Sequence, residues 1–68
     1  MTPIDAFLEA TIYRTAFALG RETYFNGGAK AVNLLVKSAF PASEARGVRD
    51  GARAAMRIIA AERKAAGK

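Results

Sequence analysis

The stretch from Ser43 to Lys64, SEARGVRDGARAAMRIIAAERK, decides the fold, because its basic and apolar residues separate onto two faces of one predicted helix. At 100° per residue, the basic side chains fall within an arc of about 80°. This basic stripe consists of Arg46, Arg49, Arg53, Arg57 and Lys64. Val48, Ala52, Ala55 and Ile59 lie opposite it. Arginines one turn apart repel each other, so we expect something acidic to face the stripe.

Gly47, Gly51 and Ala55 recur at every fourth position of the same helix, and the two glycines lie on the flank of its apolar side. Each glycine inside a helix costs about 0.8 to 1 kcal/mol relative to alanine, which calls for a structural reason. Small residues at this spacing form a groove that lets a second helix approach closely. We therefore predict that these three residues belong to an oligomer or partner interface.

A second long helix is predicted over residues 3–25. Thr2 can cap it, Pro3 suits the first helical position, and Asp5 can complete the cap from the third. The helix should end at Asn26-Gly27-Gly28, since Asn and Gly tolerate the left-handed conformation that terminates helices.

This N-terminal helix has apolar residues on two sides. One stripe contains Ile4, Leu8, Ile12 and Leu19, and an aromatic stripe of Tyr13, Phe17 and Tyr24 lies roughly opposite. One stripe can pack on the C-terminal helix, and the other then needs a second partner. We predict a homodimer seam, with the aromatic stripe at the oligomer or partner interface, or a helix enclosed in a small core. A platform on which the aromatic side chains stack nucleic-acid bases is the alternative.

The segment between these helices is ambiguous. Val32, Leu35, Val36 and Ala39 have helical spacing, but the run from residue 32 to residue 36 also suits an extended loop. Pro41 should close the segment, Phe40 should anchor the connection to the core, and Ser43 should cap the last helix. The predicted fold is one all-α domain, residues 1–68. In it, long helices at about 3–25 and 43–65 form an antiparallel helical hairpin with a short middle helix or ordered loop.

Composition limits the classes of function. The chain has 68 residues, a formal net charge of +5, and no cysteine or histidine. Disulfides and ordinary zinc sites are therefore excluded, and a chain this short gains stability from a partner or from self-association. The positive charge favours polyanions such as RNA, DNA or an anionic membrane surface. No stretch is long and apolar enough for a membrane span, so we expect a soluble cytoplasmic protein of bacterial or phage origin.

No constellation of residues suggests catalysis. The carboxylates are scattered, Ser38 and Ser43 have no histidine to activate them, and residues 27–30 lack the spacing of a phosphate-binding loop. Asp5 and Glu9 share a helix face, where they suit a solvated edge or a contact with the basic stripe better than a metal site. We expect a protein that is not an enzyme and uses no cofactor and no small-molecule substrate.

From Gly20 onward the chain resembles the ribosome modulation factor family of small basic bacterial proteins. Gly20, Gly27 and Asn33 stand at the spacing of that family, and GARAAM at residues 51–56 follows its second-helix signature at the glycine, the arginine and the alanine. Leu34-Leu35 replaces the family's Pro-Tyr, and Val48 and Ala52 stand where it has tryptophans. The resemblance covers about half the chain. It implies binding to ribosomal RNA and regulation of translation.

The leading hypothesis is a regulator that binds RNA or the ribosome through phosphate contacts of the basic stripe. Duplex DNA comes second, since the last helix offers mostly Arg and Ala and few base-reading side chains. The rival hypothesis is a protein-binding module, such as a phage or plasmid adaptor or inhibitor, that docks on an acidic protein surface. A helix lying on an anionic membrane is a weaker alternative because its apolar face is poor.

Overall fold

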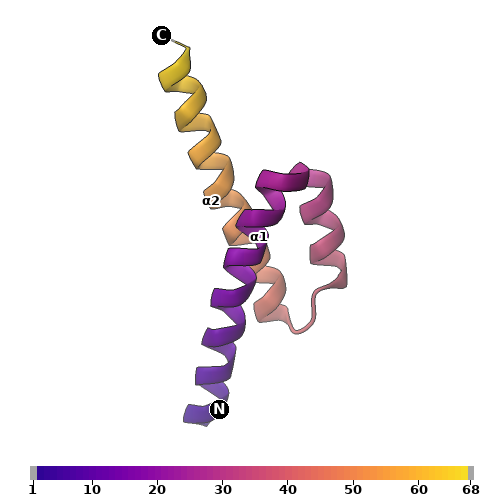
Figure 1. Ribbon diagram of the computed structural model, residues 1–68. Helices are drawn as coiled ribbons and strands as arrows, with labels where there is room; N and C mark the ends of the chain where they lie inside the picture. Colours follow the sequence, from indigo (N-terminus) through magenta and orange to yellow (C-terminus); the bar gives the residue numbers. More distant parts are fainter. Residues whose placement is uncertain (1, 68) are drawn as a thin grey trace.

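The computed structural model describes residues 2–67, which form two helices joined by a short loop. α1 spans Pro3–Ser38 and α2 spans Ala42–Ala66. In Figure 1, α1 rises from the N-terminus, bends sharply and returns, and α2 then rises behind it to the C-terminus. The molecule is elongated, with extents of 51 × 22 × 13 Å. The described residues contain two helices and no strand, so the predicted all-α helical hairpin is confirmed at this level.

The start of α1 is fixed by a capping box. The backbone N–H of Asp5 donates to Oγ1 of Thr2, and the backbone N–H of Thr2 donates to Oδ2 of Asp5, both at 3.2 Å. Pro3 occupies the first helical position, where its missing N–H costs nothing. All three predictions made for this helix start are confirmed.

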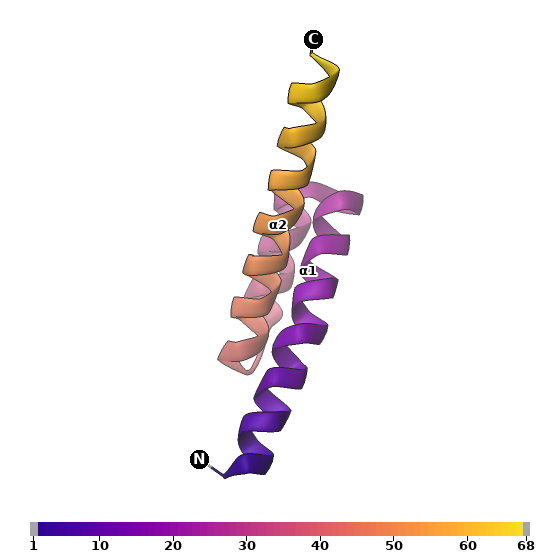
Figure 2. The same ribbon diagram turned by 90° about the vertical axis from the view of Figure 1, so that its left-hand side faces the viewer.

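Gly28 interrupts the helical backbone of α1. Its φ of 72° and ψ of −167° lie in a region that is essentially restricted to glycine. The residues Asn26-Gly27-Gly28, which were predicted to end the helix, form a bend in the structure. After this bend, residues 29–38 run back beside α2 (Figures 1 and 2). The predicted interruption at Asn26-Gly27-Gly28 is confirmed, but helical backbone runs slightly past residue 25, and Gly28 alone leaves the helical conformation. A separate short middle helix is not confirmed, since α1 continues to Ser38.

The connection to α2 differs from the prediction at two residues. Pro41, and not Ser43, is the N-cap of α2, and its carbonyl oxygen accepts the backbone N–H of Glu44 at 3.0 Å. Ser43 lies inside the first turn and makes no capping hydrogen bond, because α2 begins one residue earlier than predicted, at Ala42. The side chain of Phe40 is 88% exposed, so it does not anchor the connection to the core.

Glycines let α1 and α2 approach each other backbone to backbone. A Cβ atom on Gly47 would lie 2.6 Å from the carbonyl oxygen of Tyr13, and a Cβ on Gly51 would collide with the carbonyl oxygen of Phe17. On the α1 side, a Cβ on Gly20 would lie 2.7 Å from the Cα of α2 Val48. The small-residue groove predicted in the last helix therefore receives the first part of α1 of the same chain.

The same contacts give the direction of the helices. Gly47 lies against Tyr13, and Gly51, four residues further along α2, lies against Phe17, four residues further along α1. The first part of α1 and α2 therefore run in the same direction. Figure 2 shows them rising side by side. The predicted antiparallel arrangement of the two long helices is not confirmed. The chain reverses once at Gly28 and once at residues 39–41, and two reversals restore the original direction.

The core is small because small residues form it. Ala16, Val32, Val48 and Ala52 make the buried cluster, with Tyr24, Leu35 and Val36 packed around it. α2 contributes Val48 and Ala52 to this cluster and lies against both parts of α1, which is bent around it (Figures 1 and 2). The helical spacing predicted for residues 32–36 is thus confirmed, with Val32 buried and Leu35 and Val36 half-buried.

Candidate nucleic-acid interface

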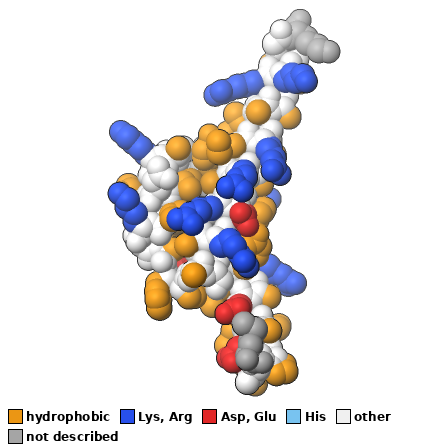
Figure 3. Space-filling view, turned by 180° about the vertical axis from the view of Figure 1, so that it is seen from behind, with side chains coloured by type: hydrophobic (Ala, Val, Ile, Leu, Met, Phe, Trp, Pro, Cys, Tyr) orange, Lys and Arg blue, Asp and Glu red, His pale blue; other side chains and the backbone are white. Residues whose placement is uncertain are grey.

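The basic stripe lies on the solvent-facing side of α2. Its buried side consists of Gly47, Val48, Gly51, Ala52 and Ala55, which leaves the opposite side of the helix to solvent. All five predicted phosphate-binding residues are exposed: Arg46, Arg49, Arg53, Arg57 and Lys64. Seen from behind in Figure 3, Lys and Arg side chains gather along the length of the molecule on this face. The periodicity of α2 therefore brings the predicted stripe together as one surface.

Tyr13 of α1 connects the two helices at the edge of this surface. The guanidinium carbon of Arg46 lies 5.3 Å from the centre of the Tyr13 ring, within the range of a cation–π interaction. The Tyr13 hydroxyl donates a hydrogen bond of 2.6 Å to Oδ2 of Asp50. Phe17, one turn further along α1, packs its ring 6.2 Å from that of Tyr13. A single tyrosine thus contacts one basic and one acidic residue of α2.

The hydrogen bond to Asp50 raises the pKa of Tyr13 above its ordinary value of 10.0. Burial and the negative charge of the carboxylate act in the same direction, and the charge of Arg46 opposes them. The hydroxyl of Tyr13 therefore stays protonated, and able to donate, throughout the neutral pH range.

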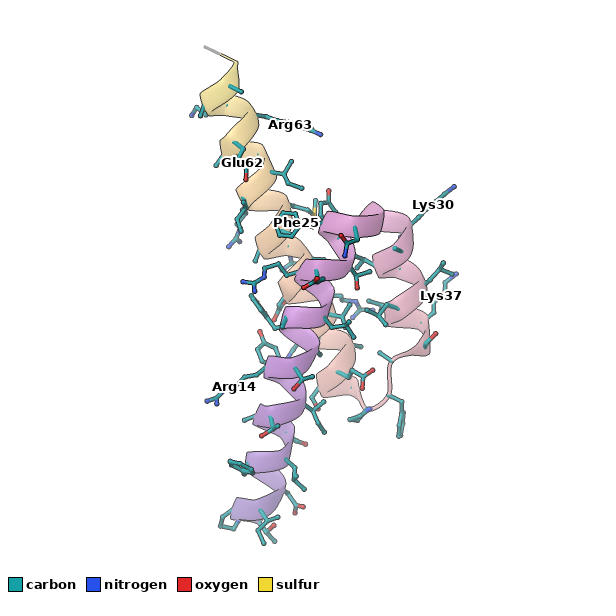
Figure 4. All side chains as sticks on the ribbon, in the orientation of Figure 1. Arg14, Phe25, Lys30, Lys37, Glu62 and Arg63 are labelled. Atoms are coloured by element: carbon teal, nitrogen blue, oxygen red, sulfur yellow. The ribbon has the colours of Figure 1, made fainter. Side chains whose placement is uncertain are left out.

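Arg14 adds a basic group from α1. It lines the same open hollow as Arg46, together with Glu9 and Ser43. In Figure 4 the Arg14 side chain points away from the side of the molecule that carries Lys30 and Lys37. Sequence periodicity could not associate Arg14 with the stripe, because their proximity depends on how α1 and α2 are paired. The hollow also places Glu9 beside an arginine of its own chain, whereas Asp5 serves the helix cap.

The residues predicted for an oligomer or partner interface lie at the contact between α1 and α2 of one chain. This set comprises Tyr13, Phe17, Tyr24, Gly47, Gly51 and Ala55. Ala55 and both glycines are buried, and the three aromatic residues are half-buried. The groove of small residues is therefore filled by α1 and is not free for a second chain.

The aliphatic stripe of α1 remains open. Ile4 is 71% exposed, Leu8 is 50% exposed and Leu19 is 45% exposed, and Ile12 between them is half-buried. Ile12 and Leu19 line a largely apolar hollow, whose other lining residues are Thr11, Thr15, Ala16 and Glu44. Of the two stripes predicted on this helix, the aromatic one packs on α2 and the aliphatic one faces solvent.

Comparisons with protein-family models, curated proteins and solved structures found no match. The geometry of the chain therefore carries the functional argument. Neither described helix contains a stretch with the length and hydropathy needed to cross a bilayer.

Proposed function

We propose that this protein binds the phosphate backbone of RNA, with the ribosome as its target, through the basic stripe of α2. The observation that supports this most directly is the exposure of all four stripe arginines along one side of a helix whose other side is buried. Arginine forks match phosphate oxygens in geometry as well as charge. The partial resemblance to ribosome modulation factors favours ribosomal RNA over duplex DNA as the source of the phosphates. Such a role belongs in the cytoplasm.

The stripe supplies affinity and orientation, not base reading. Phosphate contacts position a protein on a nucleic acid without selecting its sequence. Of the side chains in the stripe, all are arginine or lysine, and none is an amide that would pair with a base edge. We therefore propose a regulator that recognises the RNA backbone and does no chemistry on it.

A double charge reversal tests this proposal. Arg49→Glu with Arg53→Glu should abolish RNA binding and ribosome co-sedimentation while leaving helicity intact, because both side chains face solvent. The matched control is Lys30→Glu with Lys37→Glu, at exposed positions of α1. Each double reversal lowers the formal net charge from +5 to +1. If bulk charge alone drives binding, the two variants will lose affinity equally and the proposal fails.

Salt dependence gives the second criterion, measured by fluorescence anisotropy with labelled single-stranded RNA. Four phosphate contacts predict that the logarithm of the binding constant falls by roughly 3 for each tenfold rise in salt. A shallow dependence, with capture of one nuclease-resistant protein from lysate, would instead favour docking on an acidic protein surface. Circular dichroism of each variant separates loss of binding from loss of folding.

We also propose that two copies associate through the open aliphatic stripe of α1. Among the residues that the structure describes, the largest fully buried side chain is that of Val48, so a single copy buries little apolar surface. In the span from Ile4 to Leu19 the acidic residues Asp5 and Glu9 lie at the boundary of the stripe. Self-association would cover it and leave the basic stripe of α2 in solvent.

A further inference from the structure

Asp50 is the one acidic residue placed next to the basic stripe on α2. It follows Arg46 by four residues and precedes Arg53 by three. Opposite charges at these spacings attract each other on a helix surface, and the favourable order puts the acid N-terminal to the base. An unrestrained Asp50 would therefore pair with Arg53 and neutralise part of the surface that contacts phosphate.

Tyr13 gives the carboxylate of Asp50 a different partner. Its hydroxyl donates to Oδ2 of Asp50 at 2.6 Å, and Asp50 is half-buried. The same tyrosine ring lies under the guanidinium of Arg46 at 5.3 Å. The tyrosine is held in place by the close approach of the helices, since its carbonyl oxygen lies against Gly47.

We propose that Tyr13 is a positioning residue of the phosphate-binding surface. Its hydroxyl holds the carboxylate of Asp50 at the border between α1 and α2, and its ring holds Arg46 at the edge of the stripe. The carboxylate of Asp50 is then directed toward α1 instead of pairing with Arg53, whose guanidinium group stays available to a polyanion. This inference rests on the proposed binding of RNA phosphates, and it adds a residue of α1 to a site otherwise made by α2.

A double-mutant cycle tests it, with RNA affinity measured by anisotropy on the full chain. Tyr13→Phe keeps the ring over Arg46 and removes the hydroxyl, and it should weaken binding between about twofold and tenfold at low salt, as expected for neutralising one phosphate contact. In the Asp50→Asn background the same change should have no effect, because no carboxylate remains to be released. The deficit of Tyr13→Phe should also shrink as salt rises, since salt screens an exposed ion pair.

The outcomes separate this inference from the proposed function. Suppose that the wild type binds RNA and that Arg49→Glu with Arg53→Glu abolishes binding. If Tyr13→Phe then lowers the RNA affinity by the same factor with or without Asp50, the positioning role is overturned and RNA binding stands. If the wild type does not bind RNA, both fail. Thermal unfolding of all variants, with Asp50→Ala as a second acid-free background, shows whether an affinity loss reflects unfolding. A loss caused by unfolding would persist in both acid-free backgrounds and would also overturn the role.

Discussion

Two hydrogen-bonded carboxylates illustrate how single residues of this chain have separate tasks. Asp5 accepts hydrogen bonds from the hydroxyl and backbone N–H of Thr2, which lower its pKa and secure the start of α1. Asp50 accepts from Tyr13 across the helix contact. The first bond is local in sequence and serves the helix start, whereas the second joins α1 to α2.

The raised pKa of Tyr13 predicts a dependence of stability on alkaline pH. The folded state favours the neutral hydroxyl, so this contribution is fully present below the unfolded pKa near 10.0 and is lost as pH rises through the higher folded pKa. Tyr24→Phe leaves Tyr13 as the only tyrosine of the chain. Titration followed by ultraviolet absorbance should then give a higher pKa for Tyr13 in the folded variant than in the same variant in denaturant. Asp50→Asn should remove most of this difference in pKa. Coincident titration curves in the folded and denatured protein would contradict the hydrogen bond.

At the scale of the elements, α1 depends on one residue for its bend and on three glycines for its contact with α2. The bend lets residues 29–38 return so that Val32 joins the core. The glycines allow a backbone contact that no side chain could share. Each feature is local in sequence but has its consequence in the packing.

Replacing Gly28 should weaken the bend. Gly28→Ala places an L-residue at a φ of 72° and should destabilise the fold by about 1 to 3 kcal/mol, although an added Cβ meets no neighbour. A D-alanine introduced there by chemical synthesis is the matched control, because its mirror-image preference suits this conformation. Thermal unfolding should show a loss for L-alanine only. Equal losses for both enantiomers would mean that conformation at this residue does not limit stability.

Filling the helix contact should be more damaging than enlarging an exposed residue of the same helix. Gly51→Leu would collide with the backbone of α1 at Phe17, and overpacking typically costs about 1 to 3 kcal/mol. Ala61→Leu lies at an exposed position of α2 and should leave the melting temperature nearly unchanged. Chemical denaturation of the two variants measures the difference. Equal stabilities would show that the glycines serve no close contact in solution.

At the scale of the whole molecule, the chain has a basic surface on α2 and an exposed apolar surface near the start of α1. α2 exposes arginines and α1 exposes large apolar side chains near its N-terminus, among them Ile4 and Phe7. A single copy leaves this apolar surface in water. Covering it is the physical reason for the proposed dimer.

Sedimentation should therefore show a dimer at micromolar concentration. Leu8→Glu should raise the dissociation constant at least tenfold, because each copy loses an apolar contact of about 1.5 to 3 kcal/mol. Leu34→Glu is the matched control, with the same change of charge at another exposed leucine, which lies between Lys30 and Lys37. A stable monomer, or equal effects of the two variants, would contradict the use of the aliphatic stripe.

Features that depend on neighbouring residues could be predicted from the sequence. The capping box of Thr2 and Asp5 involves residues three apart, and the basic stripe from Arg46 to Arg57 follows from helical periodicity alone. The small residues at Gly47 and Gly51 correctly indicated a close helix contact. These patterns are local because a helix fixes which residues share a face.

The partner of each face was decided only by the tertiary structure. Gly28 lets the chain reverse within one residue, and this reversal together with the one at residues 39–41 makes the first part of α1 run parallel to α2. In this arrangement the aromatic stripe is covered while the aliphatic stripe stays open, and Tyr13 meets Asp50 and Arg46. Periodicity defines the faces of each helix, but their pairing depends on the bend angle and the backbone contact, which involve residues far apart in the sequence.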